Sequence, residues 1–242
     1  QVKAPPGYTY WLLKFDGVTD NKDKELADPA GFGLIEFAYY LMATAAGIEM
    51  TDCKLLKENG RSHFTTRRFD RTDSGDKIHM QSLCGIAHYD FNIAGGYSYE
   101  QAMQVIRRLD LGTEAVEQQF RRMLFNVVAR NQDDHTKNIA FLMDRDGKWS
   151  LSPAFDVIYN WNARGEWTHQ HQMSINNKRD NFTVDDIIAC EQTVVLKRGR
   201  AKEILHEVQE AVANWPLFAE QAGVNEKTAE RYARGHRMLL PQ

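Results

Sequence analysis

The feature that most constrains this sequence is a pair of polar motifs near its middle. The first, Asp133–Asn138, reads DDHTKN, and the second, Ser152–Asp156, reads SPAFD. An aspartate, an asparagine five positions later and then a second aspartate are typical of phosphotransferases. Asp133 could orient a hydroxyl nucleophile, whereas Asn138 and Asp156 could hold Mg²⁺ against the phosphates of ATP.

The sequence around these motifs favours a catalytic loop over an ordinary polar loop, in which the same side chains would cap helices and turns. An apolar-faced helix is predicted over residues 116–128, before the first motif. Strands are predicted at 139–143 and 149–151, on either side of a turn. This order is that of the C-lobe of protein-kinase-like folds. Lys137 lies between the two functional positions of its motif, where a cation could neutralise the γ-phosphate.

The first part of the chain predicts a small sheet and one helix. Residues 8–15 predict a strand that ends near Lys14, and the apolar spacing over 31–47 predicts a helix that carries Glu36. A hairpin is expected around Asn59-Gly60, because both residues accept a positive φ. A helical glutamate in kinases pairs with the strand lysine, so we expect a Lys14–Glu36 ion pair. The alternative is a glutamate on a solvated helix face.

After residue 70 the pattern is mainly helical. Residues 77–81 either add a strand or begin the second lobe, and helices are predicted near 99–110, 114–129, 184–190, 199–214 and 225–239. We therefore predict an α+β, protein-kinase-like two-lobe fold. Residues 1–70 would form a small, partial, β-rich N-lobe, with a charged loop over 17–28. Residues 71–242 would form a mainly helical C-lobe with the catalytic loop and the metal site.

Composition excludes several classes of protein. The net charge of −3 argues against strong direct binding to nucleic acid. The sequence contains no run of 18 apolar residues, so it predicts no membrane span. Cys53, Cys84 and Cys190 are far apart and form neither a zinc pattern nor a disulfide framework. Reduced thiols of this kind are typical of the cytoplasm, which is the expected location.

Four segments in order carry a resemblance to a known family. They are WLLKF at 11–15, RFDR at 68–71, and the DDHTKN and SPAFD motifs, which together span positions 11–156 of 242. On these residues the chain resembles HipA-family serine/threonine kinases, the toxins of bacterial toxin–antitoxin pairs.

The resemblance implies a role for each matching residue. It implies Asp133 as the catalytic base, Asn138 and Asp156 as Mg²⁺ ligands, and Lys14 as the lysine that reaches the α- and β-phosphates of ATP. It further implies that Arg67, Arg68 and Phe69 form the hinge beside the adenine, and that His135 and Lys137 contact the nucleotide. Glu36 would take part in nucleotide binding through its pairing with Lys14.

The resemblance also implies an activity and partners. The activity is ATP-dependent transfer of the γ-phosphate to a protein hydroxyl, with an aminoacyl-tRNA synthetase as the implied substrate and a small DNA-binding antitoxin as the implied partner. The family's glycine-rich phosphate loop and N-terminal subdomain have no counterpart before Tyr8, which suggests a fragment of a longer protein. Arg67 stands where the family pattern has an acidic residue.

Two other functions stay open on the sequence. The first is a truncated or inactive kinase-fold module that binds an antitoxin without catalysis. The second, weaker one is a small-molecule kinase of the aminoglycoside-phosphotransferase type, which shares the Asp-x4-Asn spacing but is disfavoured by the SPAFD and RFDR segments.

Overall fold

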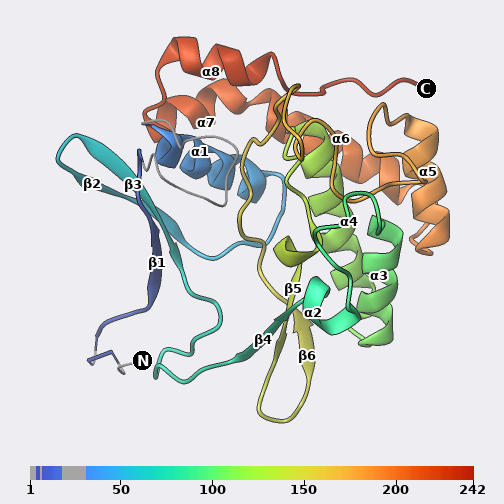
Figure 1. Cartoon of the computed structure of the whole chain (residues 1–242), viewed down its shortest axis with the longest axis horizontal. Coiled ribbons are helices and arrows are strands. Elements are labelled where there is room, and N and C mark those ends of the chain that lie inside the picture. The colour runs from blue at the N-terminus through green and yellow to red at the C-terminus, as the bar shows by residue number, and fades with distance from the viewer. Residues whose placement is uncertain (1–3, 6, 18–30) are drawn as a thin grey trace.

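The computed structural model describes residues 4, 5, 7–17 and 31–242. Two three-stranded antiparallel sheets and a group of helices make up this part of the chain (Figure 1). Almost all of the charged loop expected over 17–28 lies outside the described residues.

The first sheet contains the predicted hairpin. Its strands are β1 (Trp11–Lys14), β2 (Cys53–Glu58) and β3 (Arg61–Arg67), in the order β1-β3-β2. Asn59 and Gly60 have φ angles of 49° and 74°, so the turn uses the conformation that these residue types tolerate best. The pairing of β1 with β3 sets Lys14 opposite Phe64, near the end of the sheet that leads into the helices.

Helix α1 (Phe32–Ala45) joins this sheet to the helical part of the protein. It packs on β3 and also on α7 (Trp215–Ala222), far along the chain. Gly33 makes the close approach to the sheet possible, because a Cβ at this position would lie 2.1 Å from the carbonyl oxygen of Ser62. The helix therefore holds Glu36, which is buried, close to the first sheet.

The second sheet brings the two polar motifs together. Its strands are β4 (His79–Ser82), β5 (Ala140–Met143) and β6 (Trp149–Leu151), in the order β4-β5-β6. Of the two alternatives for residues 77–81, the structure shows a strand, which belongs to this second sheet. DDHTKN ends directly before β5, through a 3₁₀ turn at Thr136–Asn138, and SPAFD follows directly after β6. Since β5 and β6 are antiparallel, both motifs leave the same end of their hairpin.

The remaining helices agree with most of the sequence predictions. They are α2 (Leu83–Ala87), α3 (Tyr99–Arg108), α4 (Gly112–Val128), α5 (Val184–Thr193), α6 (Arg200–Ala213), α7 and α8 (Glu226–Ala233). Ser98 and Thr183 begin α3 and α5 with complete capping boxes. Among the described residues, no helix combines the length and apolarity needed to cross a membrane.

The predictions near the C-terminus were wrong in two respects. The helix expected over 225–239 ends at Ala233, and α7 was not predicted at all. Pro216 occupies the first turn of α7, where its missing N–H costs nothing, so Trp215-Pro216 begins a helix instead of ending one.

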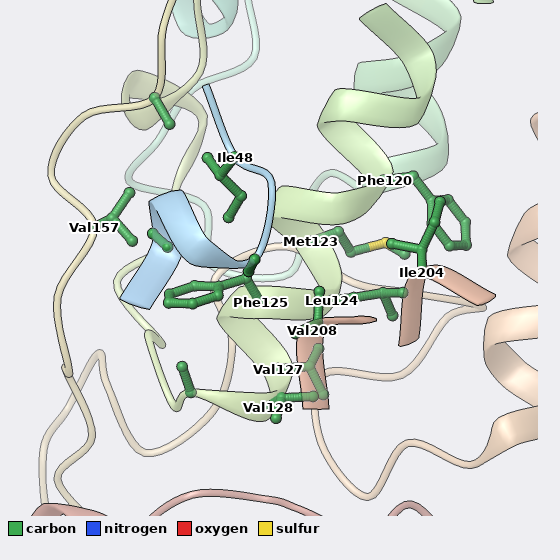
Figure 2. Packing of buried hydrophobic residues seen from close by; sticks show 14 of the residues in the cluster. Ile48, Phe120, Met123, Leu124, Phe125, Val127, Val128, Val157, Ile204 and Val208 are labelled. Carbon is green, nitrogen blue, oxygen red and sulfur yellow. The ribbon is translucent and has the colours of Figure 1, made fainter. Parts of the chain in front are cut away.

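The core is built around α4, which is buried on several sides. Figure 2 shows its apolar side chains between two groups of partners, with α6 on one side and Ile48 and Val157 on the other. The α4 residues that are fully buried include Phe120, Met123, Leu124, Phe125, Val127 and Val128. α4 leads directly into residues 129–138, which carry DDHTKN and are named the catalytic loop here for their proposed role, so the packing of α4 sets the position of that loop.

The segment that follows α8, residues 234–242, is the C-terminal tail. It runs back to the end of α4, where the Arg237 N–H donates to the carbonyl of Val128 at 2.8 Å. The carbonyl of Gly235 accepts a hydrogen bond from Nε of Arg130 at 3.0 Å. The tail therefore satisfies backbone and side-chain groups at the point where α4 ends and the catalytic loop begins.

The packing of α4 predicts a large effect of truncation. Leu124→Ala should lower the free energy of unfolding by about 2–5 kcal/mol, because a fully buried side chain would leave a cavity. Urea denaturation measures this loss. Leu217→Ala is the matched control, since Leu217 is half exposed on α7 and should cost about 0.5 kcal/mol or less. Equal losses at the two positions would contradict the described core.

The close approach at Gly33 predicts that a better helix former destabilises the protein. Gly33→Ala should cost about 1–3 kcal/mol in urea denaturation, because the added methyl group meets backbone of β3. Gly85→Ala, also in a helix, is the control. Its Cβ would lie 3.2 Å from the Gln81 side chain, which can move, and 3.7 Å from Oγ of Ser82, which is an ordinary contact distance. A neutral or stabilising Gly33→Ala would show that α1 does not lie so close to the sheet.

Candidate active site

The candidate site lies between the first sheet, α1 and the segments that flank the β5–β6 hairpin. Lys14 comes from β1, Glu36 from α1, and Asp156 from the segment after β6. Asn138 and Asp156 line the same pocket, together with His135. The structure thus brings residues that are far apart in the sequence to one place.

Lys14 makes the central contact of the site. Its Nζ lies 2.6 Å from Oε1 of Glu36 and 2.5 Å from Oδ1 of Asp156. The ion pair predicted between Lys14 and Glu36 is therefore confirmed. Burial alone would lower the pKa of Lys14, but the two carboxylates, Asp156 foremost, raise it well above its ordinary value. Lys14 is held as a cation that faces the metal motif.

Asp156 has an unusual backbone. Its φ angle is 56°, in the left-handed region that few residues other than glycine adopt. Arg130, at the start of the catalytic loop, has a φ angle of 61°. Strained backbone of this kind persists only where the surrounding structure imposes it. Here a backbone hydrogen bond from Ala154 to the carbonyl of Glu49, at 2.8 Å, fixes the chain just before Asp156.

The catalytic loop orients its own asparagine. Nδ2 of Asn138 donates to the backbone carbonyl of Asp133 at 2.8 Å, which leaves the amide oxygen as the group that could bind a metal. Nε2 of His135 lies 3.7 Å from Oδ1 of Asp133. The side chain of Asp133 is 34% exposed, so a substrate hydroxyl could reach it.

Lys137 contacts an aromatic ring that the sequence analysis did not identify. Its Nζ lies 3.2 Å from the centre of the Phe91 ring, and the same ring meets His135 edge-on. Phe91 belongs to the loop between α2 and α3, which is anchored to the catalytic loop where Thr136 donates to the carbonyl of Tyr89. The cation of Lys137 is therefore held at the surface beside the loop.

Asp134, next to the proposed base, forms a buried network that the sequence analysis also missed. Its carboxylate accepts hydrogen bonds from the Tyr99 hydroxyl at 2.7 Å and the Gln172 N–H at 2.7 Å, and lies 2.8 Å from Nδ1 of His171. Burial would raise the pKa of Asp134, but these partners, His171 first, bring it below its ordinary value. The sequence signal for this network was the second aspartate of DDHTKN, because a carboxylate that is buried needs hydrogen-bond partners.

The predicted hinge residues lie at the end of β3. Arg68 forms a two-pronged contact with Asp70, at 2.7 and 2.5 Å, and Arg67 pairs with the exposed Asp73 at 2.6 Å. The guanidinium groups thus bind carboxylates of the hinge segment itself. Phe69 packs against Phe155 of the SPAFD motif, with 5.7 Å between ring centres.

The donor set suits a hard cation such as Mg²⁺. One amide oxygen and one carboxylate line the same pocket, and Mg²⁺ commonly takes one or two protein ligands and completes its shell with water and phosphate oxygens. Within the described residues, no group of three or more His, Cys, Asp or Glu side chains is placed to hold a metal. Cys53, Cys84 and Cys190 are free thiols.

Comparison with known proteins gives a consistent family. The sequence matches the family model of the HipA-like C-terminal domain over residues 1–215. It is 25% identical over 156 residues to a protein of Sinorhizobium fredii named "Putative kinase Y4mE", a match that covers 61% of this chain and 34% of Y4mE.

Two solved structures are similar in fold. The first is HipA of Shewanella oneidensis, solved with HipB and its operator DNA, with a TM-score of 0.69, 18% identity, and coverage of 95% of this chain and 57% of that one. The second is the proinflammatory kinase CtkA of Helicobacter pylori, with a TM-score of 0.52, 11% identity, and coverage of 94% and 88%.

These matches decide the fold and the family. The chain spans 34% of the length of Y4mE and 57% of the Shewanella HipA chain. The predicted α+β, protein-kinase-like fold is confirmed by both solved structures. Because the family model covers 215 of its 242 residues, this chain belongs to the HipA-like C-terminal domain family.

Proposed function

We propose that the chain carries the catalytic centre of an ATP-dependent protein serine/threonine kinase. The observation that supports this most is the position of Lys14, whose Nζ lies within 2.6 Å of Glu36 and 2.5 Å of Asp156. A lysine fixed by a helical glutamate and facing a metal-binding aspartate is the arrangement that kinases use to hold ATP phosphates. Residues 1–70 and 71–242 would act as the two lobes around this centre.

Each residue of the centre would have a defined task. Asp133 would accept the proton of the attacking hydroxyl, because its carboxylate is partly exposed and its loop is anchored by Asn138. Lys14 would exchange Asp156 for phosphate oxygens while it stays paired with Glu36. Lys137 would add positive charge near the transferred group.

Asn138 and Asp156 would hold Mg²⁺, which, when bound with ATP, neutralises charge on the phosphates and aligns them for transfer. The segment Arg67, Arg68 and Phe69 would lie beside the adenine. The two arginine side chains are engaged with Asp73 and Asp70, so this contact would come from the backbone and from Phe69. His135 would complete the nucleotide side of the catalytic loop.

The substrate and partners form the second part of the proposal. The HipA chain that this protein resembles was solved with HipB and operator DNA. By analogy, we expect a small DNA-binding antitoxin as partner and a protein hydroxyl as acceptor, with an aminoacyl-tRNA synthetase as the first candidate substrate. The net charge of −3 supports binding to DNA through the antitoxin rather than directly, and a cytoplasmic location is expected.

Calorimetric titration with ATP, with and without Mg²⁺, tests the nucleotide site. Binding that requires Mg²⁺, followed by transfer of labelled γ-phosphate to a protein acceptor, would support the proposal. Binding without transfer to any protein would support the alternative of an inactive module that binds an antitoxin. Transfer to an aminoglycoside and not to protein would support the small-molecule kinase.

Asp133→Asn should separate catalysis from binding. The amide cannot accept the proton, so the transfer rate should fall about 10²–10⁴-fold. The Kd for ATP should change by no more than about threefold, because Asp133 is not a phosphate anchor. Asp185→Asn, an exposed carboxylate on α5, is the control and should leave both values unchanged. Wild-type transfer by Asp133→Asn would exclude this aspartate as the base.

Asp156→Asn should act on the metal instead. Replacing the charged carboxylate by a neutral amide, whose oxygen is a weaker ligand for Mg²⁺, should weaken Mg²⁺-dependent ATP binding about 10-fold or more and leave the weak Mg²⁺-independent binding in place. Titrations at several Mg²⁺ concentrations measure the difference. Asp146→Asn, in the exposed β5–β6 turn, is the matched control. An unchanged Mg²⁺ dependence would mean that Asp156 is structural.

A further inference from the structure

The polar pocket that Asn138 and Asp156 line is also lined by residues of α4, to which the proposed reaction assigns no role. Three segments supply most of its lining, namely α4, the catalytic loop with its flanks, and the metal motif, and Ile48 and Tyr99 complete it. Polar residues dominate the first two walls: Gln119, Arg122, Asn126, Asn131, Asp134, His135 and Asn138. The metal motif contributes residues 154–157, which include Asp156.

Four of these residues carry a buried polar atom that has no hydrogen-bond partner among the described residues. The atoms are Oε1 of Gln119, Nε of Arg122, Oδ1 of Asn131 and Nδ1 of His135. Gln119, Arg122 and Asn131 are each more than nine-tenths buried. Buried polar groups are almost always paired, because an unpaired one has lost its hydrogen bonds to water without replacement. Four such groups around one pocket therefore indicate a ligand that pairs with them.

Of the four residues, Arg122 has the greatest need of a hydrogen-bond partner. Its guanidinium is buried, and no ion pair to a described carboxylate accompanies it. Burial lowers the pKa of Arg122 to about 10. The contact it does make is directed at the metal motif, because Nη2 donates to the carbonyl of Ser152 at 2.8 Å. Ser152 begins SPAFD, four residues before Asp156.

The mixture of groups identifies water as the occupant. Arg122 Nε only donates, the amide oxygens of Gln119 and Asn131 only accept, and His135 Nδ1 can do either. An anion would satisfy the donor and repel the acceptors, whereas water can donate and accept at once. We propose that ordered water in this pocket links Arg122 to the catalytic loop, and that Arg122 is thereby a positioning residue for the metal motif.

The arrangement would couple the two halves of the metal site. Arg122 holds the start of SPAFD directly, through Ser152, and would hold Asn131 and His135 through water. Asn138 and Asp156 end these two segments, so their separation would depend on one buried side chain of α4. This coupling does not require that the chain transfer phosphate. Its effect on Mg²⁺ binding rests on the proposed function.

Amide hydrogen exchange on the nucleotide-free chain tests the coupling. Arg122→Met should speed exchange about tenfold in both 131–139 and 152–158, because both segments lose their shared anchor. Arg121→Met is the matched control. Arg121 is as buried as its neighbour, but it binds Glu207 and the carbonyl of Ala46, away from the pocket. Its replacement should speed exchange near α6 and residue 46 and leave the two motifs unchanged.

Gln119→Leu provides a second variant that removes an acceptor without removing a charge. It should also speed exchange in 131–139, so the proposal can be decided even if Arg122→Met fails to fold. Unchanged exchange in both motifs for whichever variants fold would overturn the proposal. A crystal structure of the chain should show water bonded to Arg122 Nε, and an anion there, or no ordered density, would also overturn it.

A titration separates this inference from the kinase proposal. Arg122→Met should raise the Mg²⁺ concentration for half-maximal ATP binding about tenfold, whereas Arg121→Met should leave it unchanged despite a similar loss of stability. If the wild-type chain binds no ATP, the kinase proposal fails, and hydrogen exchange still decides the role of Arg122. An unchanged Mg²⁺ requirement in Arg122→Met would refute its positioning of the metal motif.

Discussion

The burial of α4 is the constraint on which the rest of this structure depends. Apolar side chains on several of its faces are fully enclosed, so the helix can neither rotate nor shift without opening the core. Its last turn passes directly into the catalytic loop, and its polar residues Gln119 and Arg122 reach beneath the metal motif. The packing of α4 thus stabilises a loop whose backbone is strained at Arg130.

A second constraint is the pair of contacts that Lys14 makes, which links the first sheet to the segment that follows the second. Lys14 ties the edge strand of the first sheet to α1 and to the segment after β6, through one ammonium group and two carboxylates. Such a pair of contacts is partly exposed, so it contributes modestly to stability and more to geometry. Without ligand the lysine neutralises Asp156. In the proposed complex, phosphate would take the place of Asp156 beside Lys14, and the metal would take the place of Lys14 beside Asp156.

The sequence predicted the parts of the site that depend on local chemistry. The Asn59-Gly60 hairpin turn and the DDHTKN and SPAFD spacings each have a residue-level cause, and the Lys14–Glu36 pair follows from the kinase pattern. Phe91, His171 and Arg122 could not be found in this way, because their partners lie between 30 and 46 positions away in the chain. Only the fold creates these contacts. The failure to predict α7 had another origin, since the proline in its first turn is also a residue that often follows the end of a helix.

The C-terminal tail extends the packed structure beyond the part of the chain that the family model matches. The family match stops at residue 215, yet Gly235 and Arg237 bind Arg130 and the carbonyl of Val128. The tail is thus part of the scaffold of the catalytic loop, although similarity of sequence does not reveal it. A recombinant fragment trimmed to the family boundary would expose the last turn of α4 to solvent. Expression designs and evolutionary comparisons should therefore treat the chain up to its final residues as one cooperative unit.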